Sequence, residues 1–222
     1  TTMVGSTDRG HGEASEALRE SYGPERGPQV EETTRTVKRL GQIICERDAE
    51  RAAERDRALR EQQGGQVRMQ LRQSLLPGVR HGLIDGEHGA AGTPFPQAVG
   101  RLGPRGTAQM MDDLLPRGFL LFLRDAPSGE QFEALAAGLQ ALHAKAVCLC
   151  DPGDIDGLTG FAEADGVIAR WFDTQQCNAA LVRPDHIVYG VAADLDGAQA
   201  LLEHARIAIG MAATSAPASM LD

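Results

Sequence analysis

The sequence has little of what marks several common classes of protein. Four of its 222 residues are cysteine, one is tryptophan, and aromatic residues make up 4% of the chain. No pair of cysteines has Cys-x-x-Cys spacing, and no apolar run approaches the ~20 residues that a membrane-spanning helix needs. These absences argue against a membrane protein and against a redox-active cysteine pair. The chain is long enough to bury a core without disulfides.

Basic residues are also in deficit, because 22 Lys and Arg face 31 Asp and Glu. Residues 1–75 carry equal numbers of both signs, so the whole net charge of -9 lies in the remainder. An acidic surface does not suit the phosphates of nucleic acid, so we expect no nucleic-acid partner. The N-terminus has no basic patch followed by an apolar run, and we therefore expect no secretory signal, no membrane partner and a cytoplasmic location.

The cysteines and histidines do not form a recognisable metal site. Cys148 and Cys150 lie two apart in an apolar run, and we expect them to be buried as small hydrophobic residues. The six histidines are scattered along the chain, so the spacing of a zinc site is absent. No metal ligands are assigned.

The first third of the chain is helical in pattern. Residues 1–17 are rich in Gly, Ser and Thr, and we expect them to be poorly ordered. A short helix from Ala17 should stop at Gly23-Pro24, and Pro28 should open a longer helix. Apolar residues recur on that helix at steps of three and four, namely at Val30, Thr33, Val37, Leu40 and Ile44.

A second helix is expected to run from an N-cap at Asp48 through Ala49–Gln63 and to end at Gly64-Gly65. The apolar stripe of the first helix fades after two heptads, which is too short for a coiled coil. Packing of residues 18–75 on a larger neighbouring domain is the better interpretation.

Residues 76–106 are dense in Gly and Pro, which predicts a linker that wraps over a surface with a few extended pieces. Phe95, between two prolines, is expected to anchor it. Residues 107–210 alternate apolar strands and amphipathic helices. The parallel β-α-β order, the later β-hairpin and the terminal helix predict an α/β domain of thioredoxin-like fold. Residues 211–222 are expected to form a loose tail.

The strands and helices expected in that domain are Gly118–Leu123, Glu130–His143, Ala146–Cys150, Asp165–Phe172, Ala179–Arg183, Ile187–Val191 and Ala198–Ile209.

The candidate functional residues each have a simpler structural interpretation. Arg183-Pro184-Asp185 is explained by turn chemistry between two strands, with Arg183 paired to a carboxylate across the hairpin. His186 should be a surface residue, and Trp171 a core residue. The acidic and Gly-rich run Asp151–Gly157 lacks the bidentate Glu of a calcium loop and should be a solvated loop. No catalytic, cofactor-binding or metal-binding residue is therefore assigned.

Several segments, in order, resemble the phenolic-ring hydroxylases of the flavoprotein monooxygenase class, and most closely the 3-(3-hydroxyphenyl)propionate hydroxylase type. The most specific is Arg183-Pro184-Asp185 with the following Tyr189-Gly190. The similar segments are 18–26, 40–48, 52–56, 75–83, 92–97, 165–166, 169–172 and 180–190. The resemblance implies the C-terminal portion of an FAD-dependent aromatic monooxygenase, in which Glu25-Arg26 would form an ion pair at the start of a helix near the flavin domain.

The sequence also departs from that family. It contains no Gly-x-Gly-x-x-Gly loop, which in the family holds the flavin pyrophosphate at a helix N-terminus. Residues 1–15 contain neither the Gly-Asp pair nor the Gly-rich helix start expected there, and Gly27 replaces a usual second Arg. We therefore expect this chain alone not to bind FAD, although FAD and NAD(P)H are implied for the complete enzyme.

Three functions remain open from the sequence. The first is the C-terminal part of a phenolic-ring hydroxylase, with a flavin-binding domain or chain as partner and with packing, lid or homodimer roles. The second is a stand-alone, non-catalytic thioredoxin-like binding or assembly module. The third, a thiol oxidoreductase, would need a reactive cysteine pair.

Overall fold

The computed structural model describes residues 20, 22–66, 77–86, 88–103, 105–150 and 155–210. The expectations for residues 1–17 and 211–222 lie outside these ranges. The chain divides into two compact units, one of Thr1–Glu25 with Val79–Asp222 and one of Arg26–Gly78. None of the helices in the described ranges combines the length and the apolar character needed to cross a membrane.

The Arg26–Gly78 unit contains most of helix α3 (Tyr22–Ile44) and all of helix α4 (Ala49–Gln62). The expected break at Gly23-Pro24 and new start at Pro28 are wrong, because α3 runs through both prolines. Pro24 lies in the first turn, where a backbone N–H has no partner in the helix. Pro28 leaves only one carbonyl near the helix start without its usual donor.

Helix α4 begins and ends where the sequence predicts. The Asp48 carboxylate accepts a hydrogen bond from the Arg51 amide at 3.0 Å, which makes Asp48 the N-cap. Gly64 and Gly65 then adopt positive φ angles of 61° and 72°, a backbone conformation that glycine reaches without steric cost.

The other unit is built on a seven-stranded sheet in the order β2-β1-β5-β4-β3-β6-β7. Strands β3, β4 and β5 are parallel, and the remaining neighbours pair antiparallel. The strands are β1 (Val99–Leu102), β2 (Gln109–Met110), β3 (Leu120–Leu123), β4 (Lys145–Cys148), β5 (Leu158–Glu163), β6 (Ala179–Val182) and β7 (Val188–Ala192). The helices are α5 (Met111–Leu114), α6 (Gly129–Ala141), α7 (Val167–Gln175) and α8 (Leu195–Ala208).

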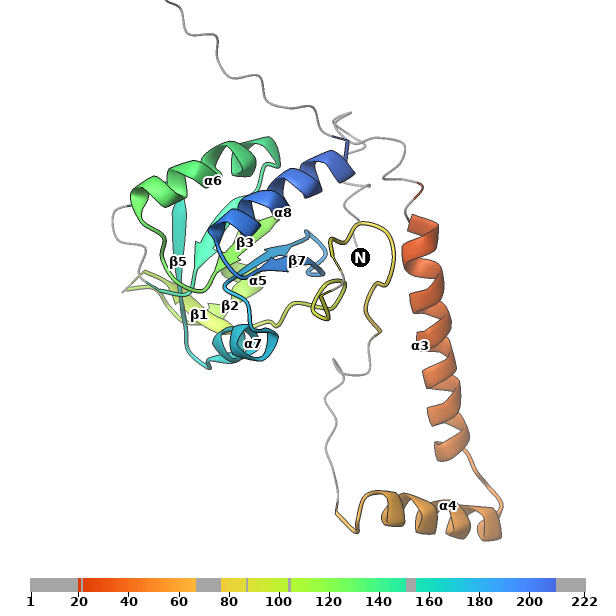
Figure 1. Ribbon diagram of the computed structural model, residues 1–222. Helices are drawn as coiled ribbons and strands as arrows, with labels where there is room; N and C mark the ends of the chain where they lie inside the picture. The colour runs from red at the N-terminus through yellow and green to blue at the C-terminus, as the bar shows by residue number, and fades with distance from the viewer. Residues whose placement is uncertain are drawn as a thin grey trace, which may run out of the picture. The chain divides into compact units, whose positions relative to one another are not determined.

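The thioredoxin-like fold predicted from the sequence is confirmed. The parallel β3-α6-β4 unit, the antiparallel β6–β7 hairpin and the terminal helix α8 occur in the predicted order. Helices α6 and α8 lie side by side on one face of the sheet (Figure 1). Strand β5 was not predicted, because its Gly- and Thr-containing sequence follows an acidic loop and lacks a clear apolar run.

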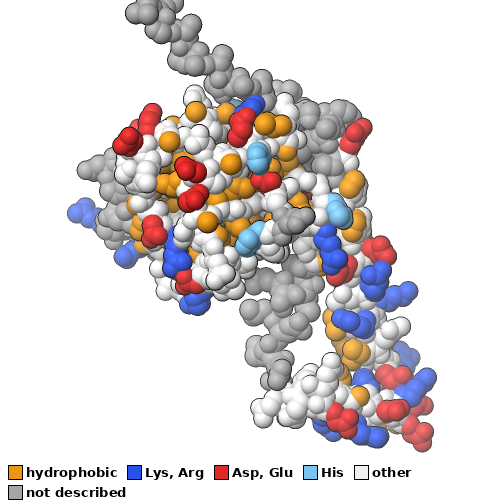
Figure 2. Space-filling view, in the orientation of Figure 1, with side chains coloured by type: hydrophobic (Ala, Val, Ile, Leu, Met, Phe, Trp, Pro, Cys, Tyr) orange, Lys and Arg blue, Asp and Glu red, His pale blue; other side chains and the backbone are white. Residues whose placement is uncertain are grey.

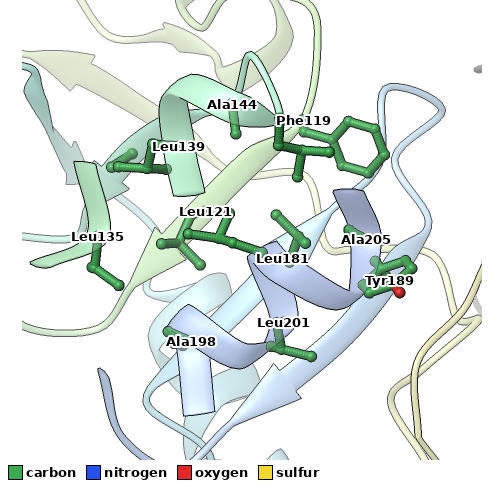
Figure 3. Close-up of a cluster of buried hydrophobic side chains, with 14 of the residues drawn as sticks. Phe119, Leu121, Leu135, Leu139, Ala144, Leu181, Tyr189, Ala198, Leu201 and Ala205 are labelled. Carbon is green, nitrogen blue, oxygen red and sulfur yellow. The ribbon is translucent and has the colours of Figure 1, made fainter. Parts of the chain in front are cut away.

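Two apolar clusters cover the two faces of the sheet. Leu121 and Leu181 point toward α6 and α8, where they meet Leu135, Leu139 and Leu201 in the first cluster (Figure 3). The alternate residues of the same strands, such as Phe122 of β3 and Ala180 of β6, point to the other face. They belong to a second cluster with Ile168 and Phe172 of α7. This alternation follows from the two-residue period of a strand. Sheet strands buried on both faces explain the continuous apolar runs in the sequence.

The Gly- and Pro-rich segment before β1 lies along strand β7. The amides of Asp85 and Gly92 donate to carbonyls of β7, and the amide of Val188 donates to the Thr93 carbonyl at 2.9 Å. Pro94 forms an isolated antiparallel bridge with Ile187. The wrapping linker predicted from the sequence thus covers one edge of the sheet, and its later part supplies strand β1, which was not predicted.

Candidate functional site

The turn between β6 and β7 forms the base of the candidate site. The His186 amide donates to the Arg183 carbonyl at 3.0 Å, which closes a turn with Pro184 in its second position. His186 follows with φ of 63°, a left-handed conformation that is uncommon for a residue with a side chain. The prediction of a Pro-Asp turn is confirmed.

The Arg183 side chain is buried and uses all three of its nitrogens. Its Nε donates to Asp185 Oδ1 at 3.1 Å and its Nη2 to Asp185 Oδ2 at 2.9 Å. Its Nη1 donates to the Leu83 carbonyl at 2.8 Å. Only 3% of the side chain is exposed. The prediction of a partner across the hairpin is wrong, because the local carboxylate lies within the turn itself.

Arg183 also binds a second carboxylate, from Glu25 in the first turn of α3. The distances are 3.2 Å from Nη1 to Glu25 Oε1 and 3.0 Å from Nη2 to Oε2, and the Glu25 side chain is 7% exposed. Glu25 Oε1 also accepts the amide of Leu83. Glu25 was expected to pair with Arg26, but Arg26 instead donates to Gln29.

The electrostatics of this cluster favour a charged arginine. Burial alone would lower the pKa of Arg183, but the hydrogen bond to Glu25 and the charge of Asp185 outweigh it and raise the pKa above its ordinary value. A guanidinium presents five donors in a planar fork that can engage two carboxylates at once. The cluster therefore acts as a structural ion group, and it contains no nucleophile or proton-transfer pair.

Gly82 gives Glu25 the space it occupies. A Cβ built on Gly82 would lie 2.2 Å from Glu25 Cγ and 2.5 Å from Oε1, and Gly82 has φ of 103°. Both its conformation and its contact therefore require glycine. The sequence offered no signal for this contact, since Glu25 and Arg183 are 158 positions apart.

The aromatic and histidine candidates make packing or surface contacts that agree with structural roles. Trp171 packs against the second cluster, with ring centroids 5.0 Å from Phe95 and 5.3 Å from Phe172. Phe95 is 5% exposed and is the anchor predicted from the sequence. His186 has a half-exposed side chain whose Nδ1 lies 3.6 Å from Asp112, which agrees with a surface role.

Two of the four cysteines, Cys148 and Cys177, have environments that disfavour the thiolate. Cys148 and Cys177 are buried and free, Cys150 is partly buried, and Cys45 is exposed. Burial raises the pKa of both Cys148 and Cys177 from 9.0 to about 11. Since the thiolate is the reactive form, neither thiol is prepared for redox chemistry at neutral pH.

These two thiols should make the protein less stable in alkali. Their pKa is higher in the folded chain, so the folded state keeps protons that the unfolded chain releases. Their contribution is complete below pH 9 and is lost as the pH rises toward about 11. We expect Cys177→Ala to reduce the fall in the urea midpoint between pH 8 and about pH 11, and Cys45→Ala to leave that fall unchanged. An equal fall in the unchanged protein and in both variants would contradict the buried thiols as its cause.

Within the described ranges no three His, Cys, Asp or Glu side chains are grouped as metal ligands. Residues 151–154 of the acidic loop lie outside those ranges, so the solvated loop expected there stays a prediction.

Four helices in the described part of the chain begin in a way that does not suit a flavin pyrophosphate. Such a group binds free backbone N–H groups at a helix N-terminus. The N-termini of α4, α6 and α8 are capped by Asp48, Ser128 and Asp194. In α7 the amides of Ile168 and Ala169 donate to the Glu163 carboxylate. These four helix starts are already satisfied by side chains of the chain itself.

Comparison with known proteins gives a curated relative and a matching family. A probable NADH-specific resorcinol 4-hydroxylase of Rhodococcus jostii (strain RHA1) is 30% identical over 184 residues, covering 81% of this chain and 32% of the relative. The chain thus spans about a third of that protein's length. Residues 92–206 match the family described as the HcaD C-terminal domain.

Solved structures share the fold at lower identity. The flavin-dependent monooxygenase PieE, in complex with FAD and substrate, has a TM-score of 0.55 and 18% identity over 91% of this chain and 41% of its own. RebC-10x with bound 7-carboxy-K252c has a TM-score of 0.57 and 19% identity over 90% of this chain and 38% of its own. The family match over residues 92–206 includes every strand of the sheet, from β1 to β7. It leaves out the start of the wrapping linker, before residue 92. The chain belongs to the HcaD C-terminal domain family, and its resemblance to the C-terminal part of FAD-dependent aromatic hydroxylases is confirmed.

Proposed function

We propose that this chain is the C-terminal part of an FAD- and NAD(P)H-dependent monooxygenase that hydroxylates phenolic rings. The flavin would be held by a separate domain or chain, and this part would serve in packing, as a lid, or as a homodimer surface. The observation that carries the proposal is the resorcinol 4-hydroxylase match. It covers 81% of the chain and so extends well beyond the family range of 92–206, into the helical segment.

Helix α3 supports a protein partner for that segment. Val30, Val37, Leu40 and Ile44 form its apolar stripe, and they are 53%, 62%, 40% and 77% exposed. Hydrophobic side chains are visible among the charged ones along this helix (Figure 2). Such a row of exposed apolar residues is unusual on a surface that meets only water.

Two glycines of α3 are consistent with a close approach on that side. A Cβ at Gly27 or Gly41 would meet nothing within 4 Å, so the glycines are not required by contacts inside the chain. In a helix, residues 27, 34 and 41 run beside the row of 30, 37 and 44. Glycine there would allow the backbone of α3 to come near a flavin-binding domain.

The FAD of such an enzyme would supply the oxygen-transfer chemistry. The residues of this chain would bind and orient the flavin-binding part, and none of them is given a catalytic role. We further propose residues 18–75 as the tail of the flavin-binding domain, 76–106 as linker and 107–210 as the thioredoxin-like domain, in a cytoplasmic protein.

The alternative is a stand-alone, non-catalytic thioredoxin-like binding or assembly module. The occupied helix N-termini of α4, α6, α7 and α8 favour it, because they leave no place there for a flavin pyrophosphate. The exposed stripe of α3 counts against it.

The visible spectrum separates the two functions. The purified chain should be colourless alone and should acquire oxidised-flavin absorption when copurified with a flavin-binding chain encoded beside it. Val37→Asp should reduce the copurified flavin by at least about tenfold, since it would place a charge in the apolar contact proposed between α3 and the flavin-binding chain. Gln42→Asp, an exposed change elsewhere on α3, is the matched control. A colourless protein with every such partner, or equal loss in both variants, would favour the stand-alone module.

A further inference from the structure

We infer that the β6–β7 turn and the Gly82–Leu83 loop form a preformed carboxylate-binding pocket, which the chain fills with its own Glu25 as a latch on the start of α3. Glu25, the pocket and the turn all belong to the same compact unit. The inference does not depend on the proposed monooxygenase function.

Three donors converge on the bound carboxylate. Arg183 Nη1 and Nη2 donate to the two different oxygens of Glu25, and the Leu83 amide donates to Oε1. Two parallel N–H bonds to separate oxygens are the fork geometry that selects a carboxylate over a neutral amide. Because the side chains are almost fully buried, these bonds are little weakened by water.

The arginine is held in place without Glu25. Asp185 takes two of its N–H bonds, at Nε and Nη2, and the Leu83 carbonyl takes a third at Nη1. Asp185 also neutralises the Arg183 charge within the turn. Departure of Glu25 would therefore leave a charge-balanced arginine that still points into the pocket, rather than an unpaired buried ion.

Gly82 shapes the cavity for the ligand. The position that a Cβ would take is occupied by the carboxylate of Glu25, with Oε1 at 2.5 Å and Cδ at 2.7 Å. This space is formed by the backbone of the loop at Gly82, so it does not depend on the position of α3. Truncation of Glu25 to alanine should therefore leave a pocket that fits a small free carboxylate.

The test is chemical rescue of Glu25→Ala in the full chain. Hydrogen exchange at the Leu83 amide should accelerate about 100-fold in chloride buffer, because this amide loses the carboxylate oxygen to which it donates. Sodium acetate at constant ionic strength should slow that exchange at least about tenfold, in a saturating manner. Acetamide at equal concentration should have no effect.

Two variants serve as controls for this test. Glu31→Ala, on the same helix in an exposed pair with Arg35, should leave Leu83 exchange unchanged. Glu25→Ala with Arg183→Met should lose the response to acetate. Should Glu25→Ala fail to fold, Glu25→Gln serves in its place. Its amide oxygen can still accept from Leu83 but no longer pairs with the Arg183 charge, so Leu83 exchange should accelerate by a smaller factor, with no rescue by acetate because the amide fills the pocket. Unchanged Leu83 exchange on removal of the carboxylate, or an acetate response that persists without Arg183, would overturn the inference.

Discussion

Arg183→Met should lower the free energy of unfolding by about 3–5 kcal/mol, which is the typical cost of removing one partner from a buried ion group. The change leaves the carboxylates of Glu25 and Asp185 in a site where they are 7% and 10% exposed, without the guanidinium that pairs with both of them. Methionine keeps much of the side-chain volume, so the loss reports charge and hydrogen bonds more than packing. Urea unfolding followed by circular dichroism measures it.

The control for this result is Arg124→Met. Arg124 makes an ion pair with Asp173 at 2.6 Å, but the two side chains are 37% and 60% exposed. Exposed pairs contribute at most about 1 kcal/mol, because water screens them. Equal losses at Arg183 and Arg124 would mean that the buried cluster does not hold this unit together.

Gly92→Ala should cost about 3 kcal/mol. Gly92 has φ of 77°, and a Cβ there would lie 1.8 Å from the Val79 carbonyl oxygen. Left-handed backbone costs a residue with a side chain about 1–2 kcal/mol, and overpacking adds a similar amount. The loop cannot easily move aside, because the Gly92 carbonyl accepts from Val79 at 2.7 Å and its amide donates to Val188 at 2.8 Å.

Gly89→Ala is the matched control in the same segment. No atom lies within 4 Å of its Cβ position, and its φ is not positive. We expect a change within about 0.5 kcal/mol. The difference between the two alanine variants in thermal or urea unfolding isolates the close approach at Gly92. A loss at Gly92 no larger than that at Gly89 would show that the wrapping segment shifts freely.

Elements with strong local patterns could be predicted from the sequence. The apolar runs of β3, β4 and β6 and the Pro-Asp turn gave the order of the thioredoxin-like domain, and the Asp48 cap placed α4 to within a residue. Strands β1 and β2 could not be found in this way. Both are short and rich in polar or small residues, and β1 is held by pairing with β5, some 60 positions later.

The ion cluster had no local signal at all. Arg183 was expected to pair with a carboxylate across the hairpin, and nothing in the sequence pointed to Glu25. Only the folded chain brings Glu25 to Arg183, through the Gly82–Leu83 loop and the turn at Asp185. Helix α3 was misplaced for a related reason: local rules treat Gly23-Pro24 as a stop, whereas the turn containing them is fixed by the contacts of Glu25.

The segment that runs beside β7 also bears on self-association. Strand β7 has five residues, and an exposed row of backbone N–H and C=O groups of that length can pair with the same strand of another molecule. Asp85, Gly92 and Thr93 occupy such groups of Val188 and Tyr189 with their own backbone bonds. Pro94 forms a bridge with Ile187, and the strand at the opposite edge, β2, has only two residues. A chain shortened to begin after Pro94 would present β7 as a bare template, and its folded domain would be prone to edge-to-edge aggregation.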